Sequence, residues 1–190
     1  MSTRNKILHS AQQLFGRYGL KKVTTDDIAR EAQVSKATIY KIYKNKQAIL
    51  KDVVGHEMEV MLASIRGAVD AQDTVEGRLR AHLVTKIKTV HQLINLYNVT
   101  NETLAEHWGP AHLMREMFIQ EESRILEEIM IKGMETGELE IANVKITASF
   151  MVISLQSLES PWAIEGLNVT VEEQVEFMLE LMMNGLRKRN

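Results

Sequence analysis

The chain has 190 residues, 45% of them hydrophobic and 25% charged, which is enough for one or two small domains with a hydrophobic core. Its formal net charge is −2, and it contains no cysteine, which excludes disulfides, thiolate zinc sites and cysteine nucleophiles and suits a reducing cytoplasm. The first residues, MSTRNKILHS, contain no apolar signal segment, and the longest apolar stretch, residues 146–158, is too short to span a bilayer. We therefore expect a cytoplasmic protein with no membrane partner.

Long segments in which apolar residues recur every three or four positions, with only two prolines in the chain, predict an all-α fold of about nine helices. The first is expected to end at Gly19, and the last to end in basic residues that suit a helix C-terminus. The predicted helices are residues 3–18, 24–32, 36–43, 46–71, 75–96, 97–107, 110–136, 143–159 and 170–188.

The segment 24–46, TTDDIAREAQVSKATIYKIYKNK, predicts two short helices joined by a tight turn. Thr24 precedes Asp27 by three residues, which is the spacing of a capping box, and Ser35 is placed to cap the second helix. The small Ala29 and the apolar Ile39 allow the two helices to cross closely. This pattern predicts a helix-turn-helix, whose second helix enters a DNA major groove.

The near-neutral total charge hides a basic N-terminal region. Residues 1–52 hold 11 Lys and Arg against 4 Asp and Glu, whereas the rest of the chain holds 12 against 21. A basic region releases counterions from DNA phosphates, and an acidic remainder is repelled by the duplex. The charge distribution therefore favours DNA binding by the N-terminal region.

Four motifs within Ile7 to Leu50 carry a resemblance to a known family. They are I-L-x-x-A-x-x-L-F-x-x-x-G, T-T-x-x-I-A-x-E-A, V-S-K-x-T-I-Y and Y-K-N-K-x-x-I-L. Together they resemble the TetR family of transcriptional regulators. The chain departs from the family at Gln33, a turn position that is usually glycine, and at Ile42, where a phosphate-contacting histidine or aromatic residue is frequent.

The resemblance implies a DNA-binding domain at 1–50 and a ligand-binding and dimerisation domain at 51–190, with a three-helix head on a helical body. It implies a dimeric regulator, expected to be a repressor, that binds a palindromic double-stranded operator and is released by a small hydrophobic effector. By position in the family motif, the residues expected to meet base edges are Lys36, Ala37, Tyr40 and Lys41. Those expected to hold phosphates are Thr25, Thr38, Tyr40 and Lys46.

The two C-terminal predicted helices, 143–159 and 170–188, are apolar over more than one face, which a monomer would expose. We therefore predict a homodimer with a four-helix interface, as in the resembled family. The predicted interface residues are Ile146, Phe150, Ile153, Ser157, Val175, Met178, Leu179 and Met182.

The middle of the chain is rich in methionine and aromatic side chains, which adapt to irregular hydrophobic ligands but also fill ordinary helical cores. The predicted pocket residues are Leu83, Ile87, His91, Ile94, Tyr97, Trp108, Met114, Met117, Phe118, Met151, Leu155 and Trp162. The neighbouring acid pair Glu121-Glu122 is predicted to lie on a solvated helix face.

Catalytic signatures such as H-E-x-x-H, G-x-S-x-G and the P-loop are absent from the sequence, so we predict no enzyme activity, catalytic residue, metal or cofactor. Three alternatives stay open. The first is a helical-bundle metal carboxylate enzyme, which metal analysis tests, and the second is an adaptor whose helix-turn-helix binds protein, which retention on DNA tests. The third is a transition-metal sensor that uses His91, His107 and His112.

Overall fold

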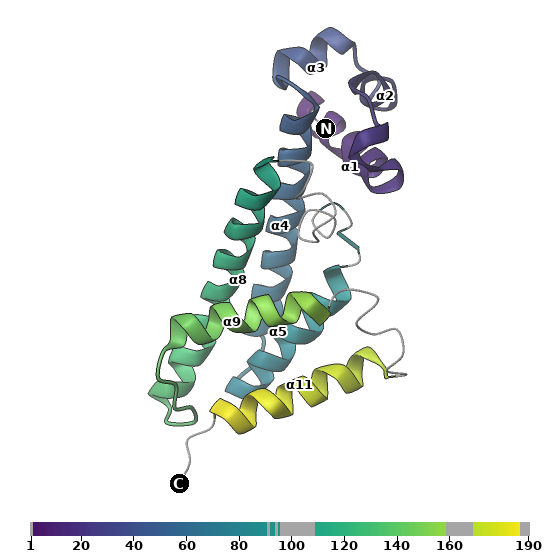
Figure 1. Cartoon of the computed structure of the whole chain (residues 1–190). Helices are drawn as coiled ribbons and strands as arrows, with labels where there is room; N and C mark the ends of the chain where they lie inside the picture. The colour runs from purple at the N-terminus through teal and green to yellow at the C-terminus, as the bar shows by residue number, and fades with distance from the viewer. Residues whose placement is uncertain (1, 91, 94, 96–108, 159–168, 187–190) are drawn as a thin grey trace. The chain divides into compact units, whose positions relative to one another are not determined.

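The computed structural model describes residues 2–90, 92–93, 95, 109–158 and 169–186 (Figure 1). The eight regular elements within these ranges are all α-helices, which confirms the predicted all-α class. They are α1 (Thr3–Lys22), α2 (Thr25–Glu31), α3 (Lys36–Ile42), α4 (Lys46–Asp70), α5 (Val75–Val90), α8 (Gly109–Glu135), α9 (Val144–Leu158) and α11 (Val171–Leu186). The helix predicted at 97–107 lies outside the described residues. Among the helices that are described, none is both long and apolar enough to cross a membrane.

Both caps predicted for the helix-turn-helix are formed. The Thr24 hydroxyl accepts a hydrogen bond from the Asp27 N–H at 3.2 Å, and the Asp27 carboxylate accepts one from the Thr24 N–H at 3.0 Å. The Thr24 hydroxyl also donates to the Asp27 carboxylate at 2.6 Å, and this bond, together with the one from the Thr24 N–H, lowers the pKa of Asp27. The Ser35 hydroxyl accepts from the Thr38 N–H at 3.0 Å. The start of α2 and the start of α3 are therefore fixed by local side chains.

The turn between α2 and α3 contains a left-handed residue. Gln33 has a φ of 56°, which is the geometry expected at the position where the family usually has glycine. A non-glycine residue there costs about 1 kcal/mol. The N–H of Val34 donates to the Ala29 carbonyl at 2.9 Å, so the turn closes the C-terminal end of α2 despite that strain.

Two helix ends differ from the sequence prediction. Gly19, with φ 76°, interrupts α1 where the prediction ended the helix, but a short continuation reaches Lys22. The fifth helix stops at Val90, short of the predicted residue 96. Near that end the Thr89 hydroxyl donates to the Thr85 carbonyl at 2.6 Å, and the Gln92 N–H bonds to the Thr89 carbonyl in the pattern of a closing turn.

The described residues form two compact units. The first, called the head unit, comprises Met1–Glu59 and Leu93–Ala111, and the second, called the body unit, comprises Val60–Gln92 and His112–Asn190. Helix α4 passes from the head unit into the body unit without a break. A continuous helix of this kind can transmit a displacement along its axis, which a flexible linker cannot.

The head unit is a three-helix arrangement extended by the first turns of α4. Helix α1 packs against α2, and α2 packs against α3 (Figure 1). The buried apolar residues of this unit include Ile7, Ala11, Phe15, Ile28, Ala29, Ile39, Ile49, Leu50 and Val53. Since Ile39 is the buried residue of α3, the opposite face of that helix points to solvent.

The body unit contains α5, α9, α11, most of α8 and the C-terminal part of α4 from Val60 onward. Helix α11 packs along α5 (Figure 1), and the Glu140 N–H donates to the Leu186 carbonyl at 2.9 Å, which fixes the end of α11. Its buried apolar residues include Met61, Ile65, Leu79, Leu83, Phe118, Ile125, Leu126, Ile129, Met130, Val152, Leu155, Val175 and Leu179.

Candidate functional site

The solvent face of α3 presents four side chains that the sequence predicted to meet DNA bases. Lys36, Ala37, Tyr40 and Lys41 are all exposed, whereas Ile39 is fully buried against the rest of the head unit. One side of α3 is therefore packed against the head unit, and the other side is exposed to solvent. This arrangement leaves two ammonium groups, a phenol and a methyl group available to a groove.

Lys36 begins α3 and forms an ion pair across the turn with Asp26 in the first turn of α2. Its ammonium lies 2.8 Å from one carboxylate oxygen of Asp26 and 2.9 Å from the other. The hydrogen bond and the charge of Asp26 raise the pKa of Lys36. Lys36, which is predicted to meet a base edge, therefore has a defined position in the protein alone.

The predicted phosphate ligands Thr25 and Tyr40 contact each other. Their hydroxyl oxygens are 3.2 Å apart, and Thr25 lies in the first turn of α2, where N–H groups favour an anion. The third predicted ligand, Thr38, shares a hydrogen bond with the Ser35 hydroxyl at 2.8 Å. Thr25 and Tyr40 are thus brought together, and Thr38 lies at the capped start of α3.

The ammonium of Lys46 bonds to the protein itself. It donates to the Leu20 carbonyl at 2.6 Å and to the Val23 carbonyl at 2.7 Å. Lys46, the first residue of α4, therefore holds the last turn of α1 and the residue that follows it in place. Its predicted phosphate contact stays a prediction, but the structure gives it a second role that the sequence pattern did not indicate.

A second polar cluster joins the start of α1 to α4. Arg4 donates to the Asp52 carboxylate at 2.6 Å, and the Tyr43 hydroxyl donates to the same oxygen at 2.9 Å. Burial raises the pKa of Tyr43, so its phenol stays a donor at neutral pH. The cluster holds Tyr43, the residue that follows α3, and so fixes where α3 ends.

Inside the head unit, a buried carboxylate binds two amide side chains. Glu57 of α4 accepts from Asn95 at 2.7 Å and from Gln12 of α1 at 3.0 Å, and Asn95 also donates to the Gln12 carbonyl at 3.2 Å. These three residues are not among the sites predicted from the sequence. The burial of Glu57 could have been predicted, because it lies four residues from each of Val53 and Met61, on the apolar face of α4.

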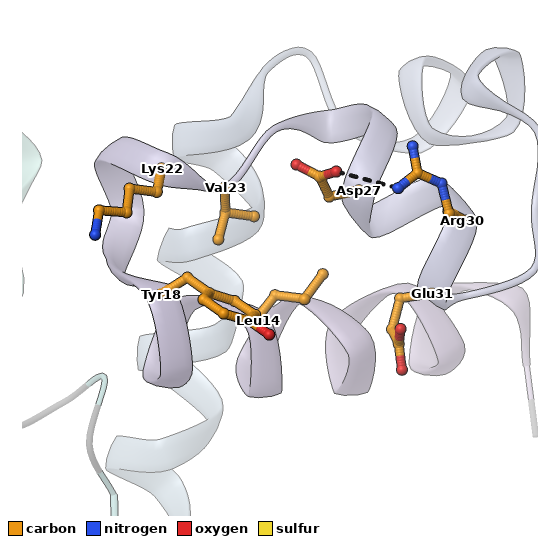
Figure 2. A pocket seen from close by; sticks show the side chains of 7 residues that line it. All are labelled: Leu14, Tyr18, Lys22, Val23, Asp27, Arg30 and Glu31. Carbon is orange, nitrogen blue, oxygen red and sulfur yellow. Dashed lines mark ion pairs between the residues drawn. The ribbon is translucent and has the colours of Figure 1, made fainter.

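A hollow of about 370 Å³ lies between α1 and α2 of the head unit (Figure 2). Its charged side chains balance, with Asp27 paired to Arg30 at 3.6 Å, so it has no net charge to attract an anion. It is not the predicted effector pocket, whose residues are in other parts of the chain. The lining residues are Leu14, Tyr18, Lys22, Val23, Asp27, Arg30 and Glu31.

The predicted effector pocket is described only in part. Leu83, Met114, Phe118, Met151 and Leu155 are buried and Ile87 is half-buried, as a pocket wall or a packed core would require. Met117 of α8 is 51% exposed, unlike the buried residues of the predicted pocket. We therefore no longer expect Met117 to line that pocket. The predicted residues His91, Ile94, Tyr97, Trp108 and Trp162 lie outside the described residues, as do the side chains of the alternative metal site, His91, His107 and His112.

A buried charged cluster crosses from α5 to α8 in the body unit. The Lys86 ammonium lies 2.7 and 2.8 Å from the two oxygens of Glu122, and the His82 ring nitrogen Nε2 lies 3.3 Å from Glu122. Burial alone raises the pKa of Glu122, but Lys86 and His82 outweigh it and hold this pKa below its ordinary value. The prediction of a solvated Glu122 was wrong, because Glu122 lies four residues after the buried Phe118, on the inner face of α8.

The predicted dimer residues divide into two groups. Ile146, Phe150 and Ile153 of α9 are exposed, and Met178 and Met182 of α11 are half-buried. The prediction was wrong for Val175 and Leu179, which are only 1% and 2% exposed because they face the core of the body unit. Phe177 and Leu181, which were not predicted from the sequence, are 64% and 59% exposed on another face of α11. The side chain of Ser157 lies outside the described part of the chain.

A capped helix-turn-helix with a basic, exposed second helix is the architecture of DNA-binding regulators. The sequence profile of the family described as "Bacterial regulatory proteins, tetR family" matches residues 7–53. The HTH-type transcriptional regulator YdeS of Bacillus subtilis (strain 168) is 31% identical over 187 residues, which cover 97% of this chain and 88% of that protein. The chain belongs to the TetR family of transcriptional regulators.

Solved structures share the fold over the full length. The fatty acid degradation regulator FadR from Bacillus halodurans aligns with a TM-score of 0.78 at 21% identity, over 100% of this chain and 98% of that chain. The transcriptional regulator FadR from Bacillus subtilis, solved in complex with stearoyl-CoA, aligns with a TM-score of 0.78 at 19% identity. The alignment covers 95% of this chain and 98% of that chain.

Proposed function

We propose that this TetR-family protein binds a palindromic DNA operator as a homodimer, represses transcription there, and releases the operator when a small hydrophobic effector binds. Residues 1–50 would bind DNA, and residues 51–190 would bind the effector and the second subunit. The observation that carries the proposal is the open face of α3, where Lys36, Tyr40 and Lys41 are exposed while Ile39 anchors the helix.

Each group on this face suits one kind of DNA contact. The ammonium groups of Lys36 and Lys41 can donate to guanine O6 and N7, and the Ala37 methyl can contact a thymine methyl. Thr25 and Tyr40, with hydroxyls 3.2 Å apart, suit a shared phosphate at the start of α2. Base contacts would select the operator, and phosphate contacts would fix the register on it.

The exposed apolar side chains of α9 and α11 support a homodimer. Phe150 of α9 and Phe177 and Leu181 of α11 expose most of their surface, and Ile146 and Ile153 extend the α9 row. Large apolar side chains gathered on two helices are an unfavourable surface for an isolated monomer. Two such helices from each subunit would form a four-helix interface, and its two-fold axis would match a palindromic site.

The effector class rests on composition and on the relatives. Met114, Phe118 and Met151 supply soft, buried apolar surface in the body unit, which suits a flexible hydrocarbon chain. The Bacillus subtilis structure with the same fold holds stearoyl-CoA. We therefore infer a long-chain acyl compound, and we expect the effector and the operator to weaken each other by the same factor, typically about 5–150-fold.

The test begins by selecting duplexes from a random pool with the purified protein and measuring affinity for the enriched sequence by fluorescence anisotropy. A two-fold-symmetric sequence is expected, and stearoyl-CoA should weaken its binding whereas coenzyme A alone should not. Native mass spectrometry of the purified protein would identify any acyl compound that it retains. If no sequence is enriched, operator binding is refuted; if stearoyl-CoA binds without changing operator affinity, that compound is not the effector.

A further inference from the structure

The ion pair between Asp26 and Lys36 joins the two helices of the motif at the surface predicted to face DNA. Each side chain is 54% exposed, and both carboxylate oxygens lie within 2.9 Å of the ammonium. An exposed pair of this kind adds only about 0–1 kcal/mol to folding stability. Its consequence for DNA binding is larger, because one partner is a predicted base reader and the other is an acid beside phosphate ligands.

The carboxylate restricts what the Lys36 ammonium can do. An ammonium has three N–H donors and no acceptor. The Lys36 ammonium donates to Asp26 Oδ2 at 2.9 Å and lies 2.8 Å from Oδ1, so the carboxylate covers one side of the ammonium. While it keeps its partner, Lys36 can therefore donate to a base edge only from the side turned away from Asp26.

Asp26 also affects how the protein binds DNA of any sequence. On non-specific DNA, lysine side chains contribute mainly by neutralising phosphates and releasing counterions. Lys36 could join them only by leaving Asp26, whose carboxylate would then be an unneutralised charge next to Thr25, the predicted phosphate ligand. Repulsion between that carboxylate and the DNA backbone opposes the movement.

We propose that Asp26 is a specificity-determining residue, which holds Lys36 in position to read a base and prevents it from serving as a sequence-independent phosphate contact. This inference rests on the proposed function, because it requires α3 to enter the groove of an operator. An acidic residue, Asp26, would then help the protein to distinguish operator from non-operator DNA.

The test is the salt dependence of binding to a non-operator duplex. Asp26→Asn keeps a polar residue near the start of α2 but removes the charge, and Glu31→Gln removes an equal charge from the far end of the same helix as the matched control. Asp26→Asn should steepen the slope of log K against log salt by about 0.9, since Lys36 gains a phosphate. Between 50 and 200 mM salt this equals an extra loss of about 3.5-fold in non-specific affinity.

The ratio of operator to non-operator affinity at low salt should fall several-fold in Asp26→Asn and stay unchanged in Glu31→Gln. In a background carrying Lys36→Met, the Asp26→Asn change should no longer alter the slope. Asp26→Ser provides a second charge-free variant, and circular dichroism checks that each variant is folded.

The inference is overturned if Asp26→Asn changes the slope no more than Glu31→Gln does, or if its effect persists with Lys36→Met, because both results indicate general charge repulsion. Failure of the proposed function is a different result. In that case the wild-type protein itself would prefer no selected duplex over the non-operator duplex.

Discussion

The Tyr40 hydroxyl lies 3.2 Å from the Thr25 hydroxyl, so α3 and the first turn of α2 are joined by two side chains predicted to hold phosphate. The contact exists without DNA. A pair that is already positioned loses less conformational freedom on binding than two mobile side chains would.

Tyr40→Phe should therefore weaken binding to operator and non-operator duplexes alike. Loss of one hydroxyl that serves both Thr25 and a phosphate is expected to remove about 0.5–1.5 kcal/mol, or roughly 2- to 12-fold in affinity. Fluorescence anisotropy titrations measure the effect. Tyr18→Phe is the control, since Tyr18 is an equally exposed tyrosine on α1. Equal affinities for Tyr40→Phe and wild type would remove Tyr40 from the phosphate contacts.

Lys46→Met separates a structural role from a DNA-binding role. The sequence pattern predicts that loss of Lys46 weakens all DNA sequences alike and lowers the salt slope by about one. The bonds from Lys46 to the Leu20 and Val23 carbonyls predict in addition a loss of about 1.5–3 kcal/mol in the free energy of unfolding. Urea denaturation measures this loss, with the exposed Lys44→Met as control. Unchanged stability would show that the carbonyl contacts contribute little.

The dimer proposal predicts that a charged side chain among the exposed apolar residues of α9 and α11 dissociates the two subunits. Phe150→Asp and Phe177→Asp should each shift the protein towards monomer at micromolar concentration, because a desolvated carboxylate at an interface is strongly unfavourable. Leu113→Asp, at a similarly exposed position on α8, should not. Sedimentation velocity measures the change. A wild-type protein that is already monomeric would refute the dimer.

The buried cluster predicts a pH dependence of stability. The pKa of Glu122 in the folded body unit is below its ordinary value of 4.5, so its contribution is complete above that pH and is lost as the pH falls through the lowered pKa. Glu122→Gln should cost about 3–5 kcal/mol at pH 7, because Lys86 is left buried without its carboxylate. The difference from wild type should shrink below pH 4.5.

Urea denaturation across this pH range tests the prediction, with the more exposed Glu121→Gln as control. Combining Glu122→Leu with Lys86→Met should recover much of the lost stability, since both charges are then removed together. A wild-type protein whose stability exceeds that of Glu122→Gln by the same amount at every pH would contradict the account.

The head unit could be predicted from the sequence because its signals are local. Capping at Thr24 and Ser35, and the left-handed turn at Gln33, depend on neighbours within a few residues. The inner face of α3 followed from Ile39, which the sequence places inside the motif and the structure buries. The body unit was harder to predict, since what decides burial there is contact between distant helices.

Helix α11 illustrates that difficulty. It is apolar on more than one face, so periodicity alone could not distinguish the face of Val175 and Leu179, which packs inside the subunit, from the face of Phe177 and Leu181, which is exposed. Glu122 was misplaced for a related reason. Its carboxylate is tolerated in the core because Lys86 and His82, both on another helix, lie within 2.8 and 3.3 Å of it.

The central claim, that α3 reads an operator, is tested most directly with the double variant Lys36→Ala and Lys41→Ala on the duplex enriched by the wild-type protein. Each lysine is expected to contribute about 1–3 kcal/mol of base discrimination. The claim therefore predicts that the double variant binds the enriched duplex little better than a scrambled duplex of the same length, while it keeps the wild-type unfolding curve. A double variant that retained full operator affinity and preference would contradict it.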